Sequence, residues 1–136
     1  MNRGKHMGTW NVDATSTPGI LRLTLEGRLT VEEMTSFVEV HNRAIDGYNG
    51  RDYKVWCDIS RLLTLSQECA QLFETAKQYS SAHENFRGSA VLVANAIVAL
   101  QHRRTSVDGG VMSTELISQD VHALEQHLRS VYRRSD

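Results

Sequence analysis

The amino-acid sequence predicts an α/β fold with a single mixed β-sheet covered by helices, in the order β-β-α-β-α-β-α-β-α. Three observations lead to this prediction. Short segments that are wholly apolar, or that alternate apolar and polar residues, indicate strands. Longer segments with apolar residues three or four positions apart indicate amphipathic helices. After an opening pair of strands the two kinds of segment alternate, and such strand–helix–strand units form parallel sheets through right-handed crossovers.

Length and composition limit the classes of protein to consider. The chain has 136 residues, enough for one domain, since domains typically contain about 100–150 residues. Hydrophobic residues make up 40% and charged residues 23%, with a formal net charge of −1, which argues against disorder and against a dedicated nucleic-acid binder. No stretch approaches the roughly 18 apolar residues of a membrane span. Residues 1–8 lack the apolar core of a secretory signal, so we expect a cytoplasmic protein with a disordered segment at 1–8 and a single domain at 9–134.

The domain begins with a predicted hairpin. Residues 9–14 alternate apolar and polar side chains from Trp10 onward, which indicates a short strand. Leu21, Leu23 and Leu25 give the following segment one apolar face, which indicates a half-buried strand. Pro18-Gly19 lies between them and is a strong turn signal.

A helix follows the hairpin. Thr30 and Glu33 match a capping box, in which each residue's side chain binds the other's backbone amide. Asn49-Gly50 is predicted to end this helix, because glycine readily adopts the left-handed conformation of a cap. His41 falls on the buried face and is interpreted as a core histidine, with a pH sensor as the alternative. The apolar positions of the helix are Val31, Met34, Phe37, Val38, Ile45 and Tyr48.

The middle of the chain predicts two strands around a second helix. Residues 53–59 carry bulky groups on both faces, as in a central strand. Residues 85–88 form a predicted loop before an almost wholly apolar strand at 89–94. Between these strands, a helix over residues 66–82 has its apolar face at Cys69, Leu72, Phe73, Ala76 and Tyr79.

The remaining elements are a third helix, a strand and a last helix. Asn95 caps a helix that is predicted to end at Arg103 and Arg104, and Gly109-Gly110 marks a turn. We interpret the two arginines as favourable charges at a helix C-terminus, with a phosphate or acidic-partner site as the alternative. The last strand is expected over residues 111–117. Ser118 is expected to cap a final helix with Val121, Leu124, Leu128, Val131 and Tyr132 on one face.

The sequence contains no recognisable metal or catalytic motif. Cys57 and Cys69 lie in apolar segments and are predicted to be reduced, buried residues. The six histidines lack metal-ligand spacing, so neither a metal nor a cofactor is expected. An enzyme that uses Asp58 or Cys57 with His83 or His102 is an alternative, which requires two such groups within hydrogen-bond reach in a cleft.

Three segments resemble the STAS domains, the sulfate transporter and anti-sigma factor antagonist family. Residues 20–30, ILRLTLEGRLT, resemble the family's second strand, which runs into a glycine before the first helix. Residues 55–62, VWCDISRL, are similar to the third strand, and residues 115–118, ELIS, to the SpoIIAA-like or STAS/SEC14 branch. The order of elements extends the resemblance over nearly the whole chain. It implies a bacterial signalling domain without enzymatic activity that binds a regulatory kinase or an anti-sigma-like protein.

The sequence departs from the family at the phosphorylation motif, Asp-Ser-Ser-Gly, at the start of the second helix. Aligned without gaps from Asp58, this chain has Glu68 at the phosphoacceptor position and Cys69 at the glycine. A gap of one or two residues would bring Ser66 there instead. Glu68 is then a fixed charge of a partner surface, Ser66 is a phosphosite, or the two are an N-cap and a first-turn acid.

We therefore predict a partner-binding surface at the start of this helix, the loop before it and the Pro18-Gly19 turn. Leu62 and Leu63 precede the helix without a polar break, so a partner is expected to cover them. The residues predicted to bind the partner are Ser60, Arg61, Leu62, Ser66 and Glu68.

Two further expectations complete the prediction. A small-ligand or lipid-binding SpoIIAA/SEC14-like domain is the alternative function, and it requires an apolar cavity beneath the helix that carries Ile97, Val98 and Leu100. A homodimer is expected because Trp10 lies on a predicted edge strand, and edge strands invite pairing.

Overall fold

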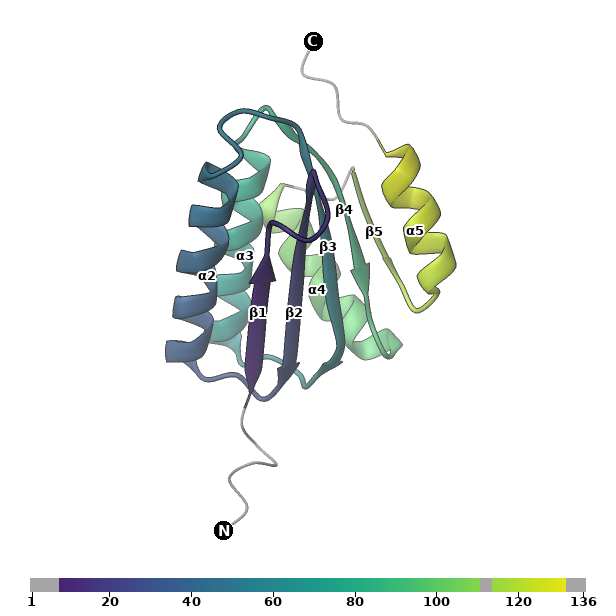
Figure 1. Ribbon diagram of the computed structural model, residues 1–136. Coiled ribbons are helices and arrows are strands. Elements are labelled where there is room, and N and C mark those ends of the chain that lie inside the picture. The colour runs from purple at the N-terminus through teal and green to yellow at the C-terminus, as the bar shows by residue number, and fades with distance from the viewer. Residues whose placement is uncertain (1–7, 111–113, 132–136) are drawn as a thin grey trace.

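The computed structural model describes residues 8–110 and 114–131, which form one five-stranded mixed sheet (Figure 1). The strands follow one another across the sheet in chain order, the first pair antiparallel and the others parallel. The predicted α/β class and antiparallel edge hairpin are confirmed. The strands are β1 (Thr9–Asp13), β2 (Ile20–Gly27), β3 (Tyr53–Leu62), β4 (Phe86–Leu92) and β5 (Glu115–Ser118).

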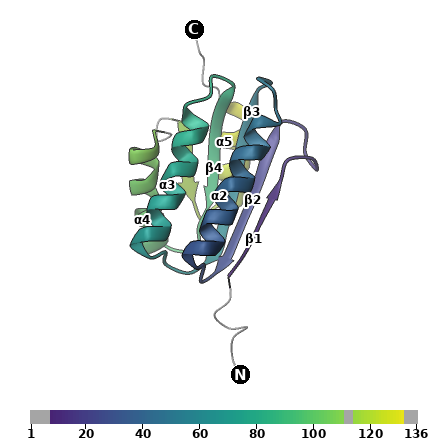
Figure 2. The same cartoon turned by 90° about the vertical axis from the view of Figure 1, so that its left-hand side faces the viewer.

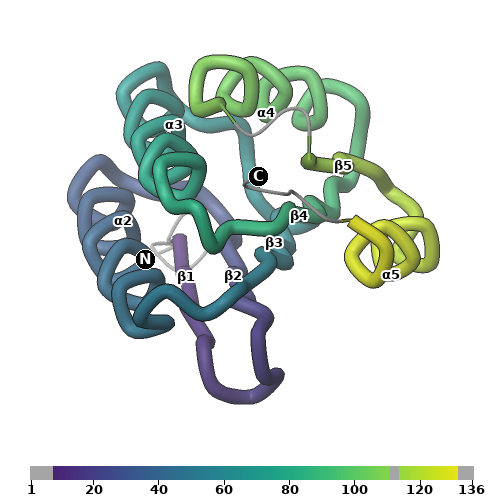
Figure 3. Tube along the Cα trace, turned by 90° about the horizontal axis from the view of Figure 1, so that it is seen from above, coloured from purple at the N-terminus to yellow at the C-terminus, as the bar shows by residue number. Residues whose placement is uncertain are grey.

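Helices cover the two faces of the sheet unequally (Figure 3). Three helices lie on one face: α2 (Val31–Asp46), α3 (Gln67–Ser81) and α4 (Ala96–Gly109). On the other face α5 (Val121–Ser130) packs mainly against β4 and β5. Figure 2 shows α2 and α3 side by side over the sheet, with β1 at its edge. Among the described residues, no helix is long and apolar enough to cross a membrane.

The main core lies between the sheet and the three helices. Leu21, Leu23 and Leu25 alternate along β2 as predicted and are buried toward the helices. Full burial of one such leucine contributes about 1.5–3 kcal/mol to folding. Trp10 lies on the edge strand β1, as predicted, and its ring packs against Phe37 at 5.9 Å. A smaller cluster, formed by Ala90, Leu124 and Leu128, lies beneath α5.

The first helix starts as predicted and ends earlier. The Glu33 amide donates to Thr30 Oγ1 at 3.1 Å, and the Thr30 amide donates to the Glu33 carboxylate at 2.8 Å, so the capping box is confirmed. The helix ends at Asp46 rather than at Asn49-Gly50. Asn49 (φ 52°) and Gly50 (φ 81°) instead form a left-handed turn beyond the helix.

Three predicted boundaries in the second half of the chain are wrong. Residues 86–88 are part of β4 rather than a loop, because Phe86 pairs with Tyr53 of β3. The third helix continues past Arg104 to Gly109, so the two arginines lie in its middle, not at its C-terminus. The last helix is capped by Asp120, whose carboxylate accepts from the amides of residues 122 and 123, and not by Ser118.

Some predictions concern residues outside the described part of the chain. These are residues 1–7 of the predicted disordered segment, residues 111–113 of the predicted last strand, and residues 132–136, which include Tyr132. Gly8, assigned by sequence to the disordered segment, is described and buried.

Candidate functional site

One edge of the sheet collects the starts of all four described helices. The parallel strands end at this edge, at the bottom of Figure 1, and each helix begins a few residues later. The N-caps are Thr30, Ser66, Asn95 and Asp120, and each side chain accepts a backbone amide of its helix. The loops that join strand ends to helix starts lie at the protein surface, where binding residues are often found. This edge is therefore the candidate site.

Exposed apolar side chains gather at the same edge. Of the six large hydrophobic side chains that are exposed in the described residues, four lie there: Val31 (37% exposed), Leu63 (44%), Ile97 (73%) and Val121 (44%). They follow β2, β3, β4 and β5 respectively, so the sequential strand order sets them in a row along the edge. Exposed apolar groups that gather on one part of a protein surface are typical of interaction sites. We call this row of four residues the carboxyl-end surface.

A groove of about 350 Å³ adjoins the carboxyl-end surface between α2 and α3. Its lining combines the apolar Val31 with the exposed carboxylate of Glu68, in the first turn of α3. The helix dipole favours a carboxylate at that position by about 0.3–1 kcal/mol. The other lining residues are Thr35, Gln71, Leu72 and Thr75.

The structure separates the predicted site residues into two groups. Ser66 and Glu68 lie at the start of α3, where Ser66 Oγ accepts the Cys69 amide at 3.1 Å as the N-cap. Ser60 and Arg61 lie on β3 instead of in a loop, because pairing with β2 extends this strand to residue 62.

Ser60 and Arg61 both make contacts within the chain. The Asp58 carboxylate accepts from the Ser60 hydroxyl at 2.7 Å and from its amide at 2.9 Å. Arg61 is exposed and lies 3.7 Å from the carboxylate of Glu26 on the neighbouring strand.

Two expectations about the partner surface are wrong. Leu62 is buried in the core, with 5% exposure, because a register shift in the β2–β3 pairing between Asp58 and Arg61 moves the buried position of the strand from residue 61 to residue 62. Of the two leucines only Leu63, which follows the end of β3, is exposed. The Pro18-Gly19 turn lies at the opposite edge of the sheet, where the Gly19 carbonyl accepts the amide of Lys54 at the start of β3.

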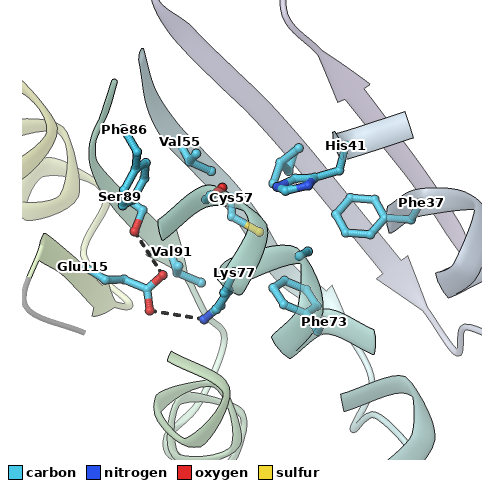
Figure 4. Close-up of a pocket in the computed structure, with 13 residues that line it drawn as sticks. Phe37, His41, Val55, Cys57, Phe73, Lys77, Phe86, Ser89, Val91 and Glu115 are labelled. Atoms are coloured by element: carbon cyan, nitrogen blue, oxygen red, sulfur yellow. Dashed lines mark hydrogen bonds and ion pairs between the residues drawn. The ribbon is translucent and has the colours of Figure 1, made fainter. Parts of the chain in front are cut away.

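The pocket that the described residues form beneath α4 does not suit the ligand-binding alternative, because it has about 140 Å³ and is lined by Arg103, Ser106, Glu115, Leu116 and Ile117 rather than by the residues that this alternative requires. Val98 is buried there, whereas Ile97 and Leu100 point to solvent. A cavity does lie between the sheet and α2 and α3, bordered by Phe37, Cys57 and Phe73 (Figure 4). Its volume of about 30 Å³ suits one water molecule, whereas ligand pockets have roughly 300–1,000 Å³.

A buried ion pair borders this cavity (Figure 4). Lys77 Nζ of α3 lies 3.2 Å from Glu115 Oε1 of β5, and both side chains are almost completely buried. Lys77 also donates to Ser106 Oγ of α4 at 2.6 Å, and Ser89 Oγ of β4 donates to Glu115 at 3.1 Å. The Ser106 hydroxyl completes the network with a hydrogen bond to Glu115. Sequence analysis missed this cluster, although Lys77 falls four residues after Phe73 on the apolar face of its helix.

The network belongs to an unusual inner face of α4. The buried residues of this helix include His102, Thr105 and Ser106. The His102 ring packs edge-on against Phe73 at 4.8 Å, and neither ring nitrogen has a hydrogen-bond partner among the described residues. Burial, with the nearby Lys77 charge, lowers the pKa of His102 to about 3, so this side chain is neutral at physiological pH.

The geometry gives no support to catalysis by Cys57 or Asp58. Burial raises the pKa of the Cys57 thiol to about 12, so it remains protonated at neutral pH. No described hydrogen bond joins it to His83 or His102, and the Asp58 carboxylate is engaged by Ser60. Over residues 8–110 and 114–131, no group of three or more His, Cys, Asp or Glu side chains is placed to hold a metal ion.

Comparison with known proteins identifies the fold. No family model matches the sequence, and neither does any curated protein. Among solved structures, a DUF3478-family protein with a SpoIIAA-like fold from Shewanella loihica matches with a TM-score of 0.63 and 16% identity, over 90% of this chain and 94% of that one. An anti-sigma factor antagonist from Mycobacterium paratuberculosis matches with a TM-score of 0.59 and 11% identity, over 91% of this chain and 96% of that one. The chain therefore has the STAS/SpoIIAA-like fold that its order of elements predicted.

Proposed function

We propose that this chain is a non-enzymatic regulatory domain of the cytoplasm that binds a protein partner through the carboxyl-end surface. The observation that carries the proposal is the row of four exposed apolar side chains at the edge where the parallel strands end and the helices begin. The similar fold of an anti-sigma factor antagonist supports a partner of the anti-sigma or regulatory-kinase class.

Leu63 and Glu68 have distinct roles in this proposal. Leu63 supplies apolar contact area, and Glu68 supplies a fixed negative charge beside the α2–α3 groove. Ser66 serves as the N-cap of α3, and its hydroxyl oxygen already accepts a hydrogen bond from the Cys69 amide. A phosphate on Ser66 would add about two negative charges in the same helical turn as Glu68, where like charges repel. The proposed binding is therefore constitutive and needs no phosphorylation of Ser66 or Ser60.

Affinity capture from the native lysate, followed by calorimetry with the purified partner, tests the proposal. Leu63→Asp and Glu68→Lys are each expected to weaken binding at least ten-fold, or about 1.4 kcal/mol. Asn49→Asp is the control, because it introduces a negative charge at an exposed position of the opposite edge. Circular dichroism of each variant establishes that the fold is retained.

Two results would contradict the proposal. Unchanged affinity of both Leu63→Asp and Glu68→Lys would place the binding surface elsewhere. Phosphate on Ser60 or Ser66 in the captured protein, detected by mass spectrometry, with binding that depends on it, would replace constitutive binding by a phosphorylation switch.

A further inference from the structure

The outer face of α4 carries large exposed apolar side chains, together with the charged Arg103, Arg104 and Asp108, whereas its inner face is mostly polar beyond Val98. An ordinary amphipathic helix has its apolar side chains on the inner face. Histidine, threonine and serine side chains point inward from this helix. Ile97, Leu100 and Val107 point outward, each more than half exposed. With Arg104, they follow spacings of three, four and three residues, which is the a/d pattern of a coiled-coil seam. We call these four residues the α4 stripe.

Polar contacts hold α4 in this orientation. The Gln101 side chain accepts the Leu65 amide at 3.2 Å and donates to the Leu65 carbonyl at 3.0 Å. Ser106 binds Lys77 from the same inner face. Together with the buried Val98, these contacts fix the helix to the domain and leave the side chains of the stripe exposed to a second helix.

Arg104 of the stripe and Arg103 beside it indicate which charges that helix carries. Arg103 and Arg104 are exposed, and neither forms an ion pair within the described residues. Acidic residues that flank a partner's apolar seam would pair with these arginines, as charged positions do beside coiled-coil seams. We infer that the α4 stripe binds an amphipathic helix of a partner protein whose apolar seam is flanked by acidic residues.

A second copy of this chain fits the stripe poorly. Antiparallel pairing of two α4 helices that sets Ile97 against Val107 also sets Leu100 against Arg104 of the other copy. Arg103 and Arg104 of both copies would then gather near the symmetry axis, where like charges oppose association. An acidic helix removes this repulsion.

The inference deepens the proposed function and rests on it, in that both assign the chain a protein partner. The α4 stripe starts at Ile97 of the carboxyl-end surface and runs away from the edge along α4. A partner helix on the stripe would therefore extend the same interface.

The test uses purified full-length protein and synthetic probes, so it is independent of the native partner. One peptide carries leucine at a and d and glutamate at e and g, where the like charges keep it from pairing with itself; a matched peptide carries lysine at e and g. Isotope-labelled protein is titrated with each peptide by NMR. The glutamate peptide is expected to perturb the outer face of α4 and to bind at least ten-fold more tightly than the lysine peptide.

Variants assign the binding to particular side chains. Leu100→Glu and Arg104→Glu should each weaken binding of the glutamate peptide at least ten-fold, because they remove apolar contact or reverse a charge. Asn49→Asp is the control and should bind this peptide with unchanged affinity, since Asn49 follows α2 and lies outside both the stripe and the carboxyl-end surface. Loss of native-partner binding in Leu63→Asp without any peptide binding at α4 would refute the inference and leave the proposed function standing.

Three other outcomes also overturn the inference. They are equal affinity for the two peptides, perturbations away from α4, and binding to vesicles of phosphatidylglycerol and phosphatidylcholine in place of the peptide. Concentration-dependent dimerisation that Leu100→Glu abolishes would likewise assign the stripe to a second copy of the chain.

Discussion

Lys77→Met should be among the most destabilising single changes in this protein that leave no cavity. Methionine has a similar length and shape but lacks the ammonium group that lies 3.2 Å from Glu115. The Glu115 carboxylate would remain buried with only the hydroxyl groups of Ser89 and Ser106 as donors. Breaking a buried pair from one side costs about 3–5 kcal/mol, because the remaining charge is uncompensated. The total stability of a domain is about 5–15 kcal/mol, so the variant should still fold.

Urea denaturation followed by far-ultraviolet circular dichroism measures this loss. The midpoint should fall while the slope of free energy against urea concentration stays the same, since the native surface is unchanged. Arg61→Met is the matched control. It removes a cation from the exposed pair with Glu26, and exposed pairs contribute only about 0–1 kcal/mol.

A double variant separates charge from packing. Lys77→Met with Glu115→Gln removes both charges and should regain part of the stability lost in Lys77→Met, because no isolated ion is left in the core. If Lys77→Met loses no more stability than Arg61→Met, the buried Lys77–Glu115 ion pair does not contribute more to the free energy of unfolding than an exposed pair, and the reasoning is wrong.

Three further predictions follow from the burial of single side chains. Stability should fall as the pH falls from 6.5 toward 3, by up to about 1.4 kcal/mol per unit, because the unfolded state protonates His102 before the folded state does. His102→Leu should flatten this dependence in urea titrations at several pH values and raise stability at pH 7 by about 1–3 kcal/mol; an unchanged pH profile would contradict the assignment. Leu62→Asp should cost more than about 4 kcal/mol in thermal unfolding and Leu63→Asp less than about 0.5 kcal/mol, an order that fails if Leu62 is accessible. The Cys57 thiol should resist a disulfide reagent at pH 8 until urea unfolds the chain, and rapid labelling of the native protein would contradict its burial.

Features that depend on nearby residues could be predicted from the sequence. The period-two leucines of β2 and the capping box at Thr30 involve contacts within a few positions, and the structure confirms both. The order of elements was also correct, because most of the strands and helices carry an apolar pattern of their own. The starts of α2, α3 and α4 could be placed because their N-caps act within one turn.

Features that depend on tertiary contacts could not be predicted. The second half of α4 contains Thr105, Ser106 and Gly109 on its buried side, so it has no apolar period, and partners such as Lys77 of α3 hold it in place. The extension of β3 to Leu62 depends on pairing with β2, which no local pattern encodes. A partner was expected to cover both Leu62 and Leu63, whereas Leu62 is buried and only Leu63 is exposed. Glu68 was correctly placed in the first turn of α3. The groove that it shares with Val31 could not be predicted, because α2 and α3 form it together.

The sequential strand order has a consequence for synthesis on the ribosome. Each strand pairs with the strand made just before it, so the sheet can form progressively as the chain emerges. Lys77, however, lies 38 residues before Glu115, so the ion pair between them can form only after β5 has been synthesised. A chain cut short before β5 would hold an ammonium group in its core without a counterion. The domain therefore reaches its full stability only after β5 has joined the sheet. Chains truncated before β5 are less stable and are exposed to proteolysis.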